Sequence, residues 1–306
     1  MNLLLTGAFI YSQAQLEALR ALGADITFVQ DERDELTMDV SRFDAVVCNG
    51  LFLQNDITRF QSLRFIQTTS VGLDRMPMDY INAQGIQICN ARGVYSVPMA
   101  EWALCGVLSI YKHIAAFLDR QANALWEKDR TVRELSGDTV LIVGCGSVGT
   151  ECAKRFKAFG TRVVAADICR PAEVCYDAYY SMDALPSALE IADVIVLTLP
   201  LTKETRGMFC RTLFSKCKRG AILVNIARGA VVYEKDLIEA LKNGTLGGAV
   251  LDVFETEPLP KESPLWGMEN VLLTPHNSFV SSQNNERLFD VIYKNLETYV
   301  KKRSDR

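Results

Sequence analysis

Three ionisable residues in the second half of the chain each follow a short apolar run. Arg228 stands in VNIARGAVV, Glu257 in LDVFETEPLP and His276 in LLTPHNS. In open α/β sheets the carboxyl ends of the strands are where ligands bind, so these side chains are candidates for one catalytic site. The alternative is that Arg228 and Glu257 form a solvated ion pair at the surface.

The three residue types suit the reduction of a carbonyl that stands beside a carboxylate, as in a 2-oxo acid. The planar guanidinium of Arg228 can bind the carboxylate and polarise the carbonyl oxygen. Hydride arrival creates an alkoxide that needs a proton, and the imidazolium of His276 can give one near neutral pH. Glu257 beside His276 would stabilise the imidazolium and orient the ring. For the other histidine, His113, which lies in a helical pattern, we expect a surface or packing role.

A glycine loop is the second feature that could bind a ligand, since the apolar run VLIV leads into GCGSVG and a helical pattern follows. Gly144 permits a tight turn, Gly146 leaves room for a pyrophosphate, and Gly149 lets the helix pack closely on the sheet. The pyrophosphate would sit on free N–H groups at the helix N-terminus. The residues expected to bind it are Gly144, Gly146, Ser147, Val148 and Gly149. The alternative is a glycine turn without a ligand.

The next apolar run, RVVAAD, ends at Asp167, where an acidic residue would bind the adenosine ribose of a dinucleotide. A carboxylate accepts both ribose hydroxyls but repels a 2′-phosphate, so NAD is favoured over NADP. Arg170 keeps NADP open, because a guanidinium could bind that phosphate. Cys145, inside the loop, could be sensitive to oxidation, and we do not expect it to be catalytic.

Apolar runs alternate with amphipathic stretches, which predicts an α/β fold whose parallel strands are joined by crossover helices. Five strands are predicted over 2–6, 25–29, 45–48, 65–68 and 87–89. Six more, the content of a full dinucleotide-binding domain, are predicted over 139–143, 162–166, 194–198, 222–226, 248–253 and 271–274. Helices are predicted over 12–22, 101–119, 151–159 and 283–302, and Pro98 suits the start of the second.

Length and composition narrow the class of protein. The chain has 306 residues, about twice a typical domain, which favours two domains. Its net charge of -4 argues against nucleic acid as a partner. We expect a cytoplasmic protein that does not bind membranes, since we see no targeting leader and no apolar stretch of the roughly 20 residues that span a bilayer. Nine cysteines without a C-x-x-C pair predict neither disulfides nor a metal site.

Together, these segments resemble the D-isomer-specific 2-hydroxyacid dehydrogenases. The resemblance rests on the segments around Arg228, Glu257 and His276, on SVGLD, on ELSGDTVLIVGCGSVG and on Trp126, and it covers nearly the whole chain. It implies an NAD-dependent oxidoreductase that transfers a hydride between nicotinamide and C2 of a small D-2-hydroxy acid or 2-oxo acid. The alternative is an NAD(H)-sensing, corepressor-like binding protein of the same fold. Another dinucleotide-dependent oxidoreductase would need a catalytic cysteine or an amine site, which we do not see.

The resemblance also implies the architecture. It predicts two α/β domains, Rossmann-like or flavodoxin-like, with parallel sheets and a cleft between them. Residues 1–94 plus 280–306 would form the substrate-binding domain, and residues 95–279 the NAD-binding Rossmann domain. The polar stretch 120–138 would be the dimerisation arm of a homodimer; a plain surface connector is the alternative.

Further site residues follow from the same resemblance. The backbone amides of Val71 and Gly72 would hold the substrate carboxylate, and Tyr95 would face the substrate. Asp252 would bind the nicotinamide carboxamide with help from Ser278. The remaining residues expected beside the cofactor are Ser96, Thr198 and Pro200.

The segment 46–56 would surround the variable end of the substrate, and it contains neither lysine nor arginine. Leu51 and Phe52, with Tyr95, therefore predict a small or apolar pocket suited to glyoxylate, hydroxypyruvate, pyruvate or a branched 2-oxo acid. A phosphorylated acid is disfavoured unless Arg92 reaches the pocket.

Overall fold

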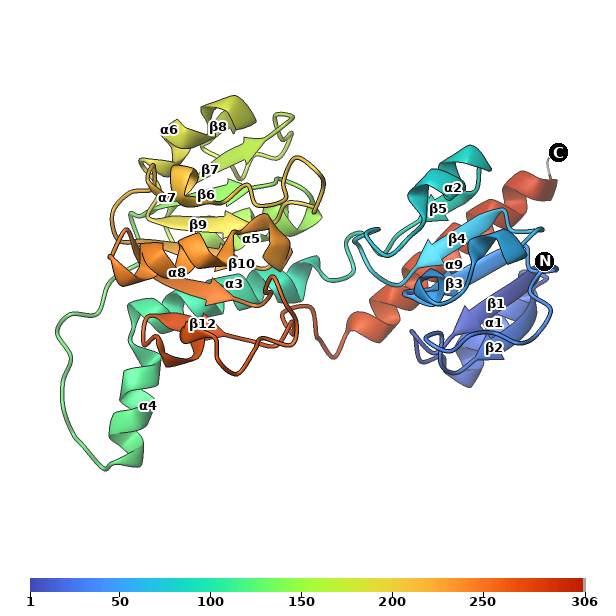
Figure 1. Ribbon diagram of the computed structural model, residues 1–306, viewed down its shortest axis with the longest axis horizontal. Coiled ribbons are helices and arrows are strands. Elements are labelled where there is room, and N and C mark those ends of the chain that lie inside the picture. Colours follow the sequence, from blue (N-terminus) through green and yellow to red (C-terminus); the bar gives the residue numbers. More distant parts are fainter. Residues whose placement is uncertain (305–306) are drawn as a thin grey trace. The chain divides into compact units, whose positions relative to one another are not determined.

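The computed structural model describes residues 1–304 of the chain. The chain forms two compact units. Unit 1 comprises Met1–Val94 and the C-terminal segment that begins at Ser281, and unit 2 comprises Tyr95–Val280. Each unit contains a parallel sheet with helices on both faces (Figure 1), so the predicted α/β class with two parallel-sheet domains is confirmed.

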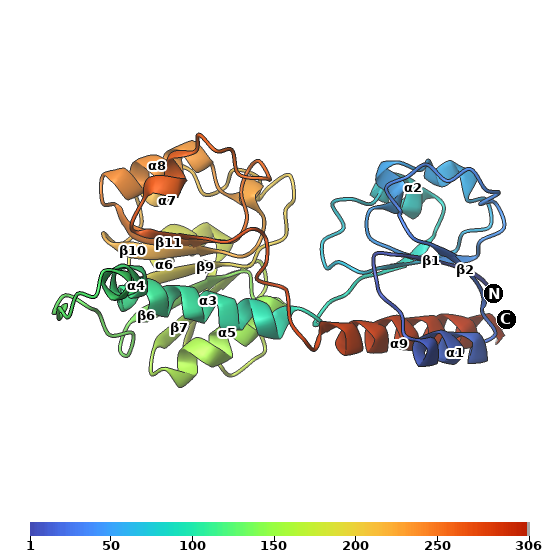
Figure 2. The ribbon, with the colours of Figure 1, turned by 90° about the horizontal axis from the view of Figure 1, so that it is seen from below.

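The sheet of unit 1 has the strand order β2-β1-β3-β4-β5. Its strands are β1 (Asn2–Thr6), β2 (Asp25–Val29), β3 (Ala45–Cys48), β4 (Phe65–Thr68) and β5 (Gln87–Cys89), as predicted. Its helices are α1 (Gln13–Ala21), α2 (Met78–Ala83) and α9 (Asn284–Ser304), with 3-10 turns η1 (Leu51–Leu53) and η2 (Ile57–Arg59). Helices α1 and α9 cover one face of the sheet and α2 the other (Figure 2).

The sequence signals for two helices of unit 1 are clear. Helix α1 begins at a capping box, in which the Ser12 side chain accepts from the main-chain N of Gln15 and the Gln15 side chain accepts from the main-chain N of Ser12. Helix α9 buries Leu288, Ile292 and Leu296, which recur at helical spacing. The C-terminal helix thus belongs to the unit formed by the first part of the chain.

The sheet of unit 2 has the order β12-β11-β10-β9-β6-β7-β8. Its strands are β6 (Thr139–Val143), β7 (Arg162–Asp167), β8 (Ala178–Ser181), β9 (Val194–Leu197), β10 (Ala221–Asn225), β11 (Leu246–Leu251) and β12 (Val271–Leu273). The helices are α3 (Ser96–Tyr111), α4 (Ile114–Ala122), α5 (Ser147–Ala158), α6 (Leu185–Leu189), α7 (Arg211–Phe214) and α8 (Glu234–Lys242). The 3-10 turns are η3 (Met182–Ala184), η4 (Gly229–Val231) and η5 (Pro264–Gly267).

Two separate apolar clusters cover the two faces of this sheet. Helices α3 and α5 bury Ala103, Val107 and Phe156 against one face, and helices α6 to α8 bury residues such as Leu189 and Leu237 against the other. Figure 2 shows α3 and α5 together below the sheet, with α7 and α8 above it. The strands between the clusters are buried on both sides, which explains their continuous apolar sequences.

Two sequence predictions about unit 2 were wrong. Strand β8 was missed, because AYYS is a half-buried edge strand without an apolar run. The single helix over 101–119 is in fact two helices, α3 and α4, separated at His113, whose φ of 50° lies in the left-handed region. His113 Nδ1 lies 3.0 Å from Asp129 Oδ2, so the break is tied to the segment that follows α4.

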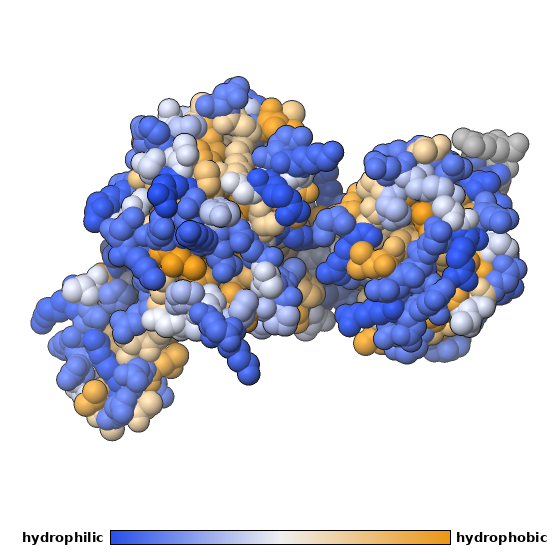
Figure 3. Space-filling view, viewed as in Figure 1, coloured by the Kyte–Doolittle hydropathy of each residue, from blue (hydrophilic) through white to orange (hydrophobic). Residues whose placement is uncertain are grey.

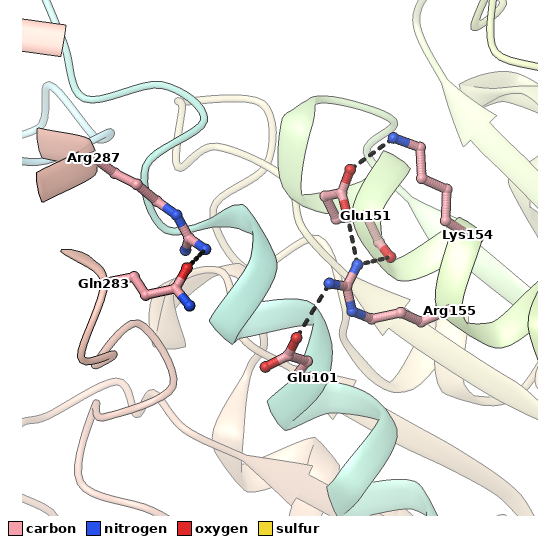
Figure 4. A network of polar contacts seen from close by, with 6 residues as sticks. All are labelled: Glu101, Glu151, Lys154, Arg155, Gln283 and Arg287. Atoms are coloured by element: carbon pink, nitrogen blue, oxygen red, sulfur yellow. Dashed lines mark hydrogen bonds and ion pairs between the residues drawn. The ribbon is translucent and has the colours of Figure 1, made fainter. Parts of the chain in front are cut away.

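A network of charged side chains joins α3 to α5 (Figure 4). Arg155 bonds Glu151 at 2.6 Å and Glu101 of α3 at 3.2 Å, and Lys154 lies 2.7 Å from Glu151. Figure 4 also shows the contact between Arg287 of α9 and Gln283, within unit 1. Because α5 starts at the glycine loop, the α3 to α5 contact holds that loop's helix in place.

The nine cysteines are free thiols. Across residues 1–304, no helix has both the length and the apolar character to cross a membrane. The same residues contain no group of three or more His, Cys, Asp or Glu side chains arranged to hold a metal ion.

Candidate active site

The strand order of unit 2 brings the three candidate catalytic residues to one edge of the sheet. Strands β10, β11 and β12 are neighbours and parallel. Arg228 follows β10, Glu257 follows β11 and His276 follows β12. Residues far apart in sequence therefore meet at the carboxyl ends of adjacent strands, where such sheets bind ligands.

The turn that carries Arg228 is fixed by its own strand end and by the next segment. The Asn225 side chain accepts from Ala227 N at 3.1 Å and donates to Arg228 O at 3.2 Å. A Cβ at Gly229 would lie 1.9 Å from the carbonyl carbon and oxygen of Phe254, so only glycine allows the main chains to approach this closely. This contact places the Arg228 turn against the segment that leads to Glu257.

Glu257 and His276 form a direct pair. Oε2 of Glu257 lies 2.8 Å from Nδ1 of His276, and Oε1 of Glu257 accepts from the main-chain N of Phe254 at 3.1 Å. The two side chains are 37% and 38% exposed, so the pair is in reach of a ligand. Because Nδ1 faces the carboxylate, Nε2 is the ring nitrogen that can exchange a proton with a bound molecule.

Asp252 holds the turn that presents His276, a role that the sequence did not indicate. Its fully buried carboxylate accepts from Thr274 Oγ1 at 2.6 Å, Asn277 N at 2.7 Å and Ser278 N at 2.9 Å. The main-chain N of His276 donates to Asp252 O at 2.8 Å, and His276 has a φ of 52°. The left-handed conformation of a non-glycine residue is costly and is maintained here by these bonds.

An aromatic contact beside the histidine was also missed. The Phe279 ring packs edge-on against the His276 ring, with 6.1 Å between centroids, and against the Tyr95 ring at 5.7 Å. Burial raises the pKa of Tyr95 to about 12, so its phenol is neutral at physiological pH. The signal was present in HNSF, three residues past His276, but a single phenylalanine after a strand does not reveal which ring it touches.

The glycine loop after β6 has the geometry that a dinucleotide requires. Gly144 has a φ of 95°, and a Cβ at Gly149 would lie 2.1 Å from Gly144 O. A Cβ at Gly146 would instead point into open space, and no side chain among residues 1–304 caps the N-terminus of α5, where Ser147 and Val148 stand. An anion can therefore approach these amides directly. The residues present fit a nicotinamide dinucleotide.

Asp167 ends β7 and lies against this loop. Its Oδ2 accepts from Cys145 N at 2.5 Å and its Oδ1 from Cys169 N at 3.3 Å, while Arg170 is exposed. Burial raises the pKa of Cys145 to about 12. Cys145 is therefore a neutral thiol near neutral pH, which argues against the sensitivity to oxidation that its place in the loop suggested.

The strand order of this sheet reverses between β6 and β9, which is the position where doubly wound sheets bind ligands. Thr198 follows β9 and its hydroxyl donates to Gly144 O at 2.5 Å, so it touches the glycine loop. Pro200 is exposed, and its carbonyl accepts from the Thr205 hydroxyl. Ser96 starts α3, and its buried hydroxyl has no hydrogen-bond partner among the residues described.

The candidate substrate residues of unit 1 lie in two loops. In the first, the carbonyls of Ser70, Val71 and Gly72 accept from the side chains of Thr68, Asn90 and Ser70, which fixes the backbone around Val71 and Gly72. In the second, Leu51 is fully buried in the core of unit 1, so its selection as a substrate contact was wrong. Phe52 is partly buried and packs against that core, and Leu53, 60% exposed, is the outward residue of that turn. Arg92 is exposed.

Comparisons with known proteins agree on one family. The model of the D-isomer specific 2-hydroxyacid dehydrogenase NAD-binding domain matches residues 104–278, all within unit 2. An (S)-sulfolactate dehydrogenase of Chromohalobacter salexigens is 31% identical over 92% of this chain and 93% of its own. A glyoxylate reductase of Thermofilum pendens is 32% identical over 88% of this chain and 82% of its own. A D-isomer specific 2-hydroxyacid dehydrogenase of Xanthobacter autotrophicus Py2, solved with NADPH and MES, is 28% identical, with a TM-score of 0.79 over 97% of this chain and 95% of its own.

The chain belongs to the D-isomer specific 2-hydroxyacid dehydrogenase family. It is therefore an oxidoreductase that acts on small 2-hydroxy or 2-oxo acids with a nicotinamide dinucleotide.

Proposed function

We propose that this protein transfers a hydride between NAD and C2 of a small D-2-hydroxy acid or 2-oxo acid, with His276 as the proton donor. The observation that carries this proposal is the 2.8 Å contact between Glu257 and His276. Both residues follow strands that neighbour β10, which leads to the Arg228 turn, or its partner β11, so all three lie at the carboxyl edge of one sheet. Pairing an imidazole with a carboxylate keeps the ring in one orientation and stabilises its protonated form.

Each residue of the trio has one task in the reduction of a 2-oxo acid. When bound, the nicotinamide supplies the hydride that C2 receives. Arg228 binds the substrate carboxylate and polarises the C2 carbonyl oxygen. Nε2 of His276 donates a proton to that oxygen as it gains charge, and Glu257 stabilises the imidazolium before the transfer. The backbone amides of Val71 and Gly72 bind the substrate carboxylate as well, and Tyr95 faces the substrate.

For the cofactor we propose NAD rather than NADP. The carboxylate of Asp167 at the end of β7 would bind the ribose hydroxyls and repel a 2′-phosphate. The pyrophosphate would bind the amides of Ser147 and Val148 above Gly146. The residues proposed to surround the nicotinamide are Ser96, Thr198, Pro200, Asp252 and Ser278. Because the Asp252 carboxylate is fully buried, it would contribute by holding the His276 turn and not by a bond to the carboxamide.

The 2-oxo acid that we favour carries only hydrogen or a small or apolar group on C2, beside the carboxylate. The segment 46–56 contains no cation, and the two residues of its turn η1 that are not fully buried, Phe52 and Leu53, are apolar. Glyoxylate, hydroxypyruvate and pyruvate therefore fit better than a phosphorylated acid or the sulfonated substrate in the name of the Chromohalobacter relative.

We further propose a homodimer formed through α4 and the segment 123–134. Helix α4 buries none of its described residues, and Leu118, Leu125 and Trp126 are 59%, 50% and 99% exposed. Figure 3 shows apolar surface on the lobe that α4 and the following segment form. Such a patch indicates an interaction surface. Analytical ultracentrifugation should find a dimer for the native chain and a monomer for a Leu118→Ser/Trp126→Ser variant. The same oligomeric state for both proteins would contradict the proposal.

The function is tested by following NADH oxidation with glyoxylate, hydroxypyruvate, pyruvate, 2-oxoisovalerate and sulfopyruvate. We expect turnover with at least one of the uncharged-side-chain acids and little with sulfopyruvate. NADH binding without turnover on any of them would reject the enzyme and favour a dinucleotide-sensing binding protein.

A further inference from the structure

A buried carboxylate stands at the switch point of the sheet of unit 1. The strand order β2-β1-β3-β4-β5 reverses between β1 and β3, and ligands of doubly wound sheets bind outside the carboxyl ends of the strands at this position. Glu32 follows β2 and is only 9% exposed. Its hydrogen-bond donors are Thr6, which ends β1, and Asn49 and Gly50, which follow β3.

The carboxylate of Glu32 bridges those two strand ends. It accepts from Thr6 Oγ1 at 2.7 Å, from Asn49 N at 3.0 Å and 3.2 Å, and from Gly50 N. All three donors are uncharged. A carboxylate is costly to bury unless it is well hydrogen-bonded, so its place here depends on the exact path of the main chain at Asn49 and Gly50. Conversely, that path is fixed by the carboxylate.

The loop that begins at Asn49 is fastened again at its far end. Asn55 Oδ1 accepts from Leu36 N at 2.8 Å, and Asn55 Nδ2 donates to Asp34 O and Leu51 O, each at 3.1 Å. Glu32 and Asn55 thus tie both ends of residues 49–55 to the segment 32–36. Between these ends, Leu51 is anchored in the core.

The two residues of η1 that are not fully buried, Phe52 and Leu53, depend on these hydrogen bonds for their positions. The Phe52 ring packs edge-on against Phe60, with 5.4 Å between centroids, and Leu53 is exposed. The chain offers no regular strand or α-helix here, only the single 3-10 turn η1. The buried hydrogen bonds of Glu32 and Asn55 therefore hold these side chains in place, as regular secondary structure does elsewhere in the chain.

We propose that Glu32 is a positioning residue for substrate selection. Its buried carboxylate holds residues 49–55 in one conformation, so that Leu53 and the partly exposed Phe52 present a fixed apolar wall to the group that the 2-oxo acid carries on C2. This rests on the proposed function, which puts that loop at the variable end of the substrate. Glu32 itself touches no substrate; it acts through the amides of Asn49 and Gly50.

The test compares Glu32→Gln with Glu35→Gln. The first variant keeps the shape of the side chain but replaces an acceptor with an NH2 group, which leaves a buried N–H without a partner. The second changes a side chain that is 79% exposed, three residues along the same segment. For the best 2-oxo acid we expect Glu32→Gln to raise KM at least about fivefold with kcat and the Kd of NADH within about twofold of the native values. Hydrogen exchange of residues 49–55 should quicken in the same variant. Glu35→Gln should change neither the KM nor the hydrogen exchange of residues 49–55.

The outcomes separate this proposal from the proposed function. If the native enzyme turns over a 2-oxo acid and folded Glu32→Gln has an unchanged KM for it, the positioning role alone is overturned, whether or not hydrogen exchange quickens. Absence of native turnover on every 2-oxo acid overturns both. If circular dichroism shows that Glu32→Gln does not fold, Thr6→Val replaces it. That variant removes one donor from the carboxylate and is expected to raise KM in the same direction, and an unchanged KM overturns the proposal.

Discussion

Nδ1 of His276 lies 2.8 Å from Oε2 of Glu257, whose other oxygen accepts from the main chain at Phe254. The carboxylate is thus held by its own segment and directed at the ring that follows the neighbouring strand. A positioned carboxylate behind an imidazole both orients the ring and stabilises its charge.

Replacing Glu257 with Gln should therefore impair turnover without impairing cofactor binding. The amide can still accept a hydrogen bond but carries no charge, and we expect kcat/KM for 2-oxo acid reduction to fall by about tenfold to a hundredfold. Fluorescence titration should give an unchanged Kd for NADH. Glu255→Gln, which alters an exposed carboxylate two residues earlier, is the control, and equal activity of the two variants would contradict the role of Glu257.

Substitution by alanine should affect different properties at two glycines of the same loop, stability at Gly149 and NADH binding at Gly146. At Gly149 a Cβ would meet Gly144 O at 2.1 Å, so Gly149→Ala should lower the free energy of unfolding by about 1–3 kcal/mol. At Gly146 a Cβ would meet no atom of the described chain within 4 Å, so Gly146→Ala should keep its stability but bind NADH at least about tenfold more weakly. Chemical denaturation and NADH titration measure the two effects, and unaltered NADH binding in Gly146→Ala would show that the pyrophosphate lies elsewhere.

The charge at Asp167 should decide the choice of dinucleotide. We expect the native enzyme to use NADH at least about tenfold more efficiently than NADPH, because a 2′-phosphate beside the carboxylate is repelled. Asp167→Asn should reduce that ratio, chiefly by improving NADPH. Arg170→Gln is the matched variant, since it removes the cation that could bind the phosphate. Equal native efficiencies with the two cofactors would refute the preference for NAD.

The pKa of Cys145 gives a prediction about pH. Burial raises this pKa to about 12, so the protonated thiol predominates at lower pH, and the reactive thiolate fraction falls about tenfold for each pH unit below the pKa. Iodoacetamide near neutral pH should modify the exposed Cys105 and Cys169 first, and labelling of Cys145 should rise steadily as the pH is increased. Peptide mass spectrometry measures the order, and early labelling of Cys145 would contradict its neutral state.

The apolar runs predicted the fold well because parallel strands buried on both faces leave an unmistakable pattern. Strand β8 lacked that pattern and was missed, and the break at His113 depends on a left-handed residue and on Asp129, neither of which periodicity reveals. For the site, the sequence pointed to Arg228, Glu257 and His276, and strand order explains why they converge. The burial of Leu51 and the tasks of Asp252 and Phe279 depend on tertiary contacts that neighbouring residues do not encode.

The most direct test of the central claim is the turnover of His276→Asn. Asparagine tolerates the left-handed backbone found at this position, so the turn should survive. With NADH and the best 2-oxo acid, we predict that kcat falls by about a hundredfold to ten-thousandfold while the Kd of NADH is unchanged. Native turnover in this variant would contradict the assignment of His276 as the proton donor.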